Sequence, residues 1–223
     1  MDHLVIPLDG DHIHALAALT HGIVTGCGLA MTADRTDPHV TLVAYTGLSP
    51  EVAHSSIDAV AARTAPFVLH AHGYGFFTGD EPTELSLHVQ VVRTRALDTL
   101  HRGLRAALHR AGADIAGWSE PDLWSPHITL LDRGLDPVSL GTAARWLAHR
   151  RHPSWRMPVD RVVVVGGRRD RSRPRAVVRF GARAASARAG PDDALQELPI
   201  GPRSQKGVHQ DDATGEDVRR RGQ

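Results

Sequence analysis

The chain has 223 residues, of which 41% are hydrophobic and 23% charged, and its formal net charge is +1 at pH 7. This length and composition predict a folded globular domain with its own core and exclude wholesale disorder. The single cysteine, Cys27, excludes an internal disulfide framework and a cysteine-based zinc site. No apolar stretch reaches the ~18 residues that a membrane span needs, and no signal peptide is recognised, so we expect a cytoplasmic protein.

Hydrophobic periodicity divides most of the chain into alternating strands and helices. The strands are predicted at 4–8, 39–45, 67–77, 85–92, 127–131, 159–165 and 176–180. The helices are predicted at 11–22, 50–64, 97–112 and 137–150. Asp9 or Asp11, Ser49 and Asp136 stand where helix N-caps are expected. Residues 26–28 are expected to form a turn, and residues 118–126 a loop.

The periodic pattern ends at about Ala182. Residues 183–223 contain few large apolar side chains and balance seven basic residues with seven acidic ones. Such a segment cannot bury enough apolar surface to offset its ordering entropy. We therefore predict one domain at 1–182 and a disordered tail at 183–223.

One pentapeptide pattern occurs twice. It reads Pro-His-β-branched-Thr-Leu, once at residues 38–42 and once at residues 126–130. Chance alone predicts roughly one bare His-x-Thr in this composition, but below about one in a thousand for each full match. The repeat, one copy in each half of the predicted domain, indicates two related lobes that face each other.

The spacing of the motif explains its chemistry. In a strand, residues i and i+2 point to the same face, so His39 projects with Thr41, and His127 with Thr129. Two such strands would surround a phosphate with two imidazoles and two hydroxyls. One imidazole can accept a proton while the other donates one, because the unperturbed pKa of histidine lies near neutrality. The threonine hydroxyls can bind non-bridging phosphate oxygens, and the reaction needs no metal and no cofactor.

The two motifs resemble those of the two-histidine phosphoesterases, which include the bacterial 2′-5′ RNA ligase or RNA 2′,3′-cyclic phosphodiesterase family. The glycine-bearing strand at 67–77 and the helix at 97–104 that leads into Trp124–His127 add weaker likeness over residues 1–182. The resemblance implies an α+β bilobal fold, with two pseudo-symmetric lobes of antiparallel sheet, outer helices and a central groove. It implies that His39 and His127 are catalytic, with His39 as the acid and His127 as the base. It also implies that Thr41 and Thr129 bind phosphate.

We therefore expect a phosphodiesterase that hydrolyses 2′,3′-cyclic phosphates or 2′-5′ phosphodiesters of RNA or nucleotides. Its partners would be RNA ends or nucleotide cyclic phosphates, without a membrane, and the protein would be a monomer. Ligation of RNA ends is an alternative, because the same groups can run the reaction backward. A third alternative is a module that captures RNA ends without turnover. In that case the eleven arginines between 150 and 183 would carry the binding.

Other side chains have both a functional and a structural interpretation. Trp124 could stack a base at the groove mouth, although core packing explains it equally well. Arg133 could neutralise phosphate, but a surface arginine is the more common case. His70, His72 and His88 could form a metal site, but without cysteine or acidic ligands nearby a polar sheet face is favoured.

Overall fold

The computed structural model describes residues 1–29, 37–79, 84–150, 152–166 and 174–181. The predicted tail at 183–223 lies outside these residues. The strands within them are β1 (Asp2–Pro7), β2 (His39–Thr46), β3 (Phe67–Phe77), β4 (Leu85–Val91), β5 (Asp114–Ile115), β6 (His127–Leu135), β7 (Ser154–Val159), β8 (Arg161–Val165) and β9 (Pro174–Arg179). The helices are α1 (Gly10–Cys27), α2 (Pro50–Ala61), α3 (Arg95–Arg110), the short 3-10 turn η1 (Gly117–Ser119) and α4 (Pro137–Ala148).

All the strands belong to one antiparallel sheet. Their order is β7-β3-β4-β6-β2-β1-β8-β9, and β5 pairs with the far end of β2. β6 and β2 are neighbours at the middle of this order, with three strands outside each of them. The predicted α+β class is confirmed, and the two motif strands turn out to lie side by side.

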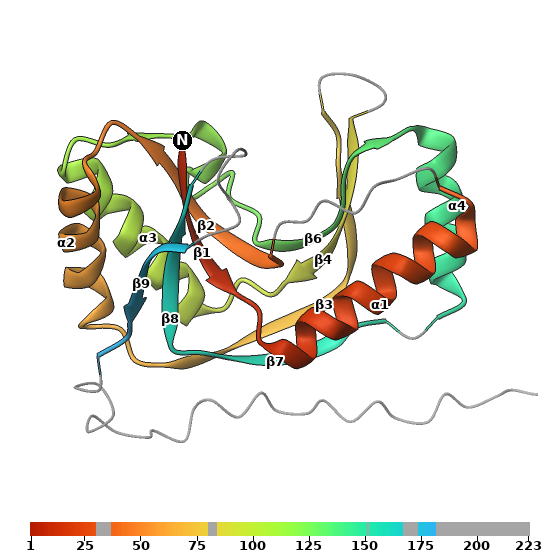
Figure 1. Ribbon diagram of the computed structural model, residues 1–223, viewed down its shortest axis with the longest axis horizontal. Helices are drawn as coiled ribbons and strands as arrows, with labels where there is room; N and C mark the ends of the chain where they lie inside the picture. Colours follow the sequence, from red (N-terminus) through yellow and green to blue (C-terminus); the bar gives the residue numbers. More distant parts are fainter. Residues whose placement is uncertain (30–36, 80–83, 151, 167–173, 182–223) are drawn as a thin grey trace, which may run out of the picture. The chain divides into compact units, whose positions relative to one another are not determined.

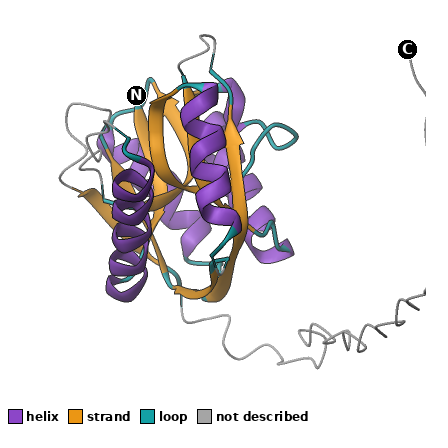
Figure 2. Ribbon diagram, turned by 90° about the vertical axis from the view of Figure 1, so that its right-hand side faces the viewer, coloured by secondary structure: helices purple, strands orange, loops and turns teal. Residues whose placement is uncertain are grey.

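The helices pack in two pairs on different parts of the sheet. α2 and α3 contact each other and pack on β9 and β2, whereas α1 and α4 contact each other and pack on β6 and β4. Figure 1 shows the two pairs over opposite ends of the sheet, and Figure 2 shows helices in front of its strands. No helix in the described part of the chain is long and apolar enough to cross a membrane.

The helix starts follow the capping rules that the sequence displays. Asp9 accepts a hydrogen bond from the backbone N–H of His12 at 3.0 Å, and Ser49 accepts one from Val52. Asp136 caps α4 in the same way. Each cap satisfies a backbone donor that has no partner inside its helix, a contribution of about 1 kcal/mol. These predicted starts are confirmed.

The apolar stripes of the sequence become the core. Alternate residues of β4 are buried, and the leucines of α3 are at most 2% exposed. The residues concerned are Leu85, Leu87, Val89 and Val91 on β4 and Leu97, Leu100, Leu104 and Leu108 on α3.

The predicted end of α1 is wrong. The helix continues past Gly22 to Cys27, so Gly26 is helical, and Gly28 ends the helix in the left-handed conformation at φ 64°. Gly22 and Gly26 both lie against the Trp146 ring of α4, where a Cβ on Gly26 would come within 2.1 Å of Trp146 Nε1. Packing against α4 thus sustains a glycine-containing turn that has a weak helical preference on its own.

Other boundaries also differ from the predicted ones. The strand β7 was not predicted, because Pro158 and its polar residues argue against a strand. It is an edge strand, where proline is tolerated. The short β5 and η1 were missed, with η1 overlapping the start of the expected loop. β6 extends beyond Leu131 to Leu135. The predicted pairing of the last two strands is confirmed, as β8 pairs with β9.

Close packing of α1 on α4 predicts opposite effects for two glycine substitutions. Gly26→Ala should lower the free energy of unfolding by about 1–3 kcal/mol, because the added methyl overlaps the Trp146 ring. Gly141→Ala, on the exposed side of α4 where an added methyl would meet nothing within 4 Å, should raise it by about 0.5–1 kcal/mol. Urea denaturation of both variants measures these changes in the free energy of unfolding. Equal effects of the two changes would contradict the packing.

Candidate active site

The two motif strands meet at a pair of fully buried residues. Val40 of β2 is paired with Ile128 of β6 in antiparallel register, and both are 0% exposed. Because neighbouring residues in a strand point to opposite faces, the residues on either side of this pair project to the other face of the sheet. They are His39, Thr41, His127 and Thr129. The register makes the two histidines diagonal neighbours across the strands.

Both histidines make the same hydrogen bond to their own chain. Nδ1 of His39 lies 2.7 Å from the carbonyl oxygen of Asp37, and Nδ1 of His127 lies 2.8 Å from that of Ser125. A carbonyl oxygen only accepts, so each Nδ1 donates a proton and the neutral ring carries none on Nε2. Each Nε2 is therefore the nitrogen that can exchange a proton with a substrate.

A β-bulge follows each motif threonine. Next to β1 the register shifts between Thr41 and Val43, and next to β4 it shifts between Thr129 and Leu131. The extra residue, Leu42 or Leu130, is buried in each case. Alternation alone puts each threonine on the histidine face, and the bulge that follows lets the next two residues of each strand remain in the core. The two strands thus match in sequence, in hydrogen bonding and in backbone irregularity.

Aromatic rings surround His127 on one side. Phe77 of β3 lies edge-on to it with ring centroids 4.7 Å apart, and His88 of β4 lies at 5.0 Å. Phe77 and His88 stack on each other at 4.3 Å. Gly75, opposite His88 on β3, makes room for the stack, since a Cβ there would be 2.4 Å from His88 Nε2. His88 is only 4% exposed.

This environment favours neutral imidazoles. Burial lowers the pKa of His127 below 6.5, although the Ser125 carbonyl and the Asp132 carboxylate act in the opposite direction. Burial and the nearby His127 lower the pKa of His88 to about 4. The sequence favoured a polar sheet face over a metal site for His88 and did not single out Phe77. The alternation of β4 was the available signal, but the contact with His127 depends on strand order.

Trp124 occupies a different place from the expected base platform. It is 4% exposed, its Nε1 donates to the carbonyl oxygen of Thr41 at 3.0 Å, and its ring stacks on His101 at 3.9 Å. Almost no ring surface is open to a base, so the geometry fits the packing alternative. The indole joins the first motif to the loop that precedes the second.

The remaining candidates are Arg133, His70 and His72. Arg133 lies in β6, but its side chain is outside the described residues. His70 and His72 face Arg156 and Ser154 across the β3–β7 pair, and the described residues contain no cluster of three or more His, Cys, Asp or Glu able to hold a metal.

The arginine-rich stretch is described only in part. Arg161 and Arg179 both donate to Asp160 at 3.0 Å, and Arg175 donates to Asp2. These arginines are therefore partly neutralised by neighbouring carboxylates.

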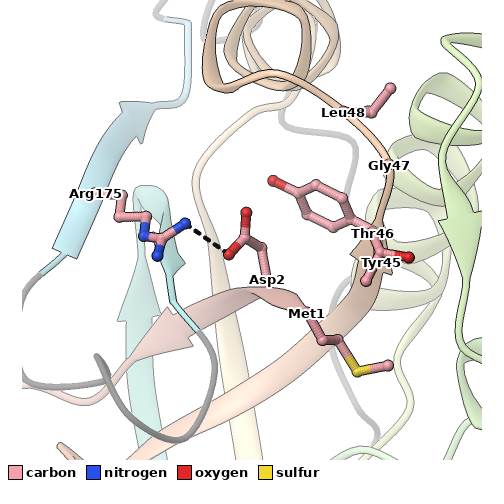
Figure 3. A pocket seen from close by; sticks show the side chains of 7 residues that line it. All are labelled: Met1, Asp2, Tyr45, Thr46, Gly47, Leu48 and Arg175. Carbon is pink, nitrogen blue, oxygen red and sulfur yellow. Dashed lines mark hydrogen bonds and ion pairs between the residues drawn. The ribbon is translucent and has the colours of Figure 1, made fainter.

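A cavity of about 280 Å³ opens at the other end of β2. Arg175 donates a hydrogen bond to Asp2 at 2.9 Å on one wall, and Figure 3 shows the Tyr45 ring on another. Met1, Thr46, Gly47 and Leu48 complete the lining. Burial raises the pKa of Tyr45 to about 12, so its hydroxyl stays protonated. None of the motif residues lines this cavity, so it is separate from the two-histidine face.

Comparisons with known proteins agree on a family and a fold. A family model described as the 2′-5′ RNA ligase superfamily matches residues 16–171. E. coli LigT complexed with 3′-AMP is 19% identical over 80% of this chain and 97% of its own, with a TM-score of 0.51. A structure described as a phosphoesterase is 19% identical over 81% of this chain and 97% of its own, with a TM-score of 0.50. A protein from Thermus thermophilus is 20% identical over 74% of this chain and 87% of its own, with a TM-score of 0.50.

A search of curated proteins gave no match. At these identities the structural likeness establishes the fold, which is LigT-like.

The buried histidines predict acid sensitivity of the fold. His88 and His101 each have a pKa of about 4 when folded but near 6.5 when unfolded, so between these values only the unfolded chain binds the protons. The contribution of the two neutral histidines to stability is therefore fully present above pH 6.5 and is lost as pH falls toward 4. We expect the free energy of unfolding to drop by on the order of 2–5 kcal/mol between pH 7 and 4.5.

Denaturant titrations at several pH values measure this loss. The His88→Asn variant should show a shallower pH dependence, whereas His54→Ala, on the exposed side of α2, should leave the slope unchanged. An unaltered slope in His88→Asn would contradict the lowered pKa of His88.

Proposed function

The chain belongs to the 2′-5′ RNA ligase superfamily, and from this premise we propose that it is a metal-independent phosphodiesterase. Its substrates are 2′,3′-cyclic phosphates or 2′-5′ phosphodiesters of RNA or nucleotides. The observation that carries the proposal is the convergence of two matching His-x-Thr strands on one face of the sheet, about the Val40–Ile128 pair.

The proposed reaction is an in-line displacement at phosphorus. His127 accepts a proton from water at Nε2 while the water oxygen forms a bond to phosphorus. The bond from phosphorus to one ribose oxygen breaks, and protonated His39 gives its Nε2 proton to that oxygen. His127 ends protonated and His39 neutral, so proton exchange with solvent resets the pair. Each transfer typically contributes ~10²–10⁴ in rate.

The threonines have a separate part in the proposal. The hydroxyls of Thr41 and Thr129 donate hydrogen bonds to the two non-bridging oxygens, which carry more negative charge as the water attacks. Such a charged hydrogen bond contributes about 1.5–3 kcal/mol. Thr41 is half-buried and Thr129 exposed, so both hydroxyls lie near the surface of the sheet.

The assignment of base and acid is supported by the environment of His127. Because burial keeps its pKa below 6.5, His127 is mostly neutral at pH 7 and can accept a proton at once. The Nδ1 bond to the Ser125 carbonyl holds the ring in the tautomer that leaves Nε2 as the acceptor.

A bilobal arrangement with a central groove belongs to the same proposal. It is supported by the two halves of the sheet, each with its own pair of helices and one motif strand at the inner edge. The substrate class is supported by the LigT structure, which is complexed with 3′-AMP, a nucleotide with a phosphate on its ribose.

Ligation is the second candidate, favoured by the family description. An RNA 5′-hydroxyl would replace water as the nucleophile, and the same two imidazoles would exchange the protons. Incubation with two RNA fragments, one ending in a cyclic phosphate, distinguishes a joined product from hydrolysis.

Removal of either motif histidine should abolish turnover of a 2′,3′-cyclic nucleotide. We expect His39→Ala and His127→Ala each to lower kcat by ~10²–10⁴, because one proton transfer is lost. His54→Ala is the matched control, since this histidine lies exposed on α2, and it should keep full activity. Circular dichroism checks the fold of each variant. Full activity in either motif variant would contradict the proposal, and so would inactivity of the native protein without added metal.

The pH dependence of kcat/KM should show an acid limb with an apparent pKa below 6.5. Protonation of His127 removes the base, and burial places the pKa of that step below the ordinary histidine value. Initial rates between pH 4.5 and 9 measure the limb, within the range where the protein remains folded. An acid limb at or above pH 6.5 would argue against His127 as the base.

A further inference from the structure

The two motifs are matched so closely that something outside them must make them unequal. Both histidines bond through Nδ1 to a carbonyl two residues earlier, and both threonines precede a bulge. Acid–base catalysis nevertheless needs one ring neutral and the other protonated. The strands beside the two motifs supply a difference of this kind.

The strands outside the motifs present different side chains. On one side, β1 places Val5 opposite Thr41 and Pro7 opposite His39. On the other side, β4 places His88 opposite Thr129 and Gln90 opposite His127. His88 thus occupies the position that corresponds to Val5 in the other half.

The ring of Phe77 adds to this difference between the strands outside the two motifs. Phe77 of β3 stacks on His88 and meets His127 edge-on, so each of the three rings contacts the other two. Gly75 leaves the space that the His88 ring fills. We call Phe77, His88 and His127 the three-ring cluster.

Packing alone does not explain His88. Its Nδ1 is buried and has no hydrogen-bond partner among the residues the structure describes. A buried polar atom without a partner is unfavourable, and an apolar residue such as Val5 would avoid that cost. Departures of this kind from local packing rules are expected at functional sites.

We propose that His88 and Phe77 are positioning residues that make the two motifs chemically unequal. They hold the His127 ring in the three-ring cluster, exclude water from one side of it, and so make His127 the proton acceptor and His39 the donor. This inference rests on the proposed function and explains how that function divides its two roles.

The groups that face His127 from each neighbouring element agree with its role as the proton acceptor. From β4 come the His88 ring and exposed Gln90, from β3 Phe77, from β2 the first motif, and from its own strand Asp132. The Asp132 carboxylate favours the charged imidazole. His88 remains neutral above about pH 4 and adds bulk to the cluster without charge. Loss of contact with water is the largest influence and favours the neutral imidazole.

An NMR titration of the His127 ring tests the proposal in the full-length chain without substrate. The variants are Phe77→Ala and His88→Val, the latter placing the residue of the other half at this position. Both should let water reach His127 and raise its titration midpoint by about 0.5–1 pH unit. Phe76→Ala is the matched control: Phe76 is the adjacent residue, 57% exposed, and points to the opposite face. It should leave the midpoint unchanged.

Two more conservative variants provide a test if the first variants fail to fold. Phe77→Leu removes the ring but keeps apolar bulk and should give a smaller rise, and His88→Phe keeps a ring and should retain the native midpoint. Midpoints that stay unchanged in folded Phe77→Leu and His88→Val overturn the proposal. So does a rise of equal size in Phe76→Ala.

Activity assays separate this inference from the proposed function. If native protein turns over a 2′,3′-cyclic nucleotide, the acid limb of kcat/KM should move upward in Phe77→Ala and His88→Val in parallel with the NMR midpoint. Turnover with an unmoved limb and midpoint overturns only the role of the cluster. No turnover by native protein overturns the proposed function and the acceptor role, even when the midpoint moves.

Discussion

The pairing of Val40 with Ile128 is the contact on which the arrangement of the site depends. It joins β2 and β6 at the middle of the sheet, and both side chains are fully buried. Because the strand period is two, burial of these residues determines that the flanking histidines and threonines face the other way. A slip of one residue in either strand would move its motif into the core. The apolar side of the motif is therefore what orients its polar side.

The near-symmetry of the motifs and the asymmetry of their neighbours have different consequences. Matching Nδ1 bonds give both histidines the same tautomer and leave each Nε2 as the exchanging nitrogen. The strands β3 and β4 then place the rings of Phe77 and His88 against His127. One sheet thus supplies a common geometry at both histidines together with a ring cluster at His127. The proposed chemistry needs both properties.

Much of this could be predicted from the sequence, since the deciding interactions are local. Helix starts follow from Ser49 and Asp136, and the facing of His39 with Thr41 follows from strand periodicity. The end of α1 could not be predicted, because it depends on Trp146, more than a hundred residues away. Strand β7 was hidden by Pro158, which is tolerated only because that strand forms an edge. The contact of His88 and Phe77 with His127 requires the order of three strands, which no local pattern contains.

The central claim is that both imidazoles act on one phosphorus. A crystal structure with a nucleoside 2′- or 3′-monophosphate bound tests it most directly. We expect Nε2 of His39 and Nε2 of His127 each to lie within about 2.6–3.2 Å of oxygens of the same phosphate. A phosphate held by only one of the two rings, or seated instead beside Arg175 in the cavity at the far end of β2, would contradict it.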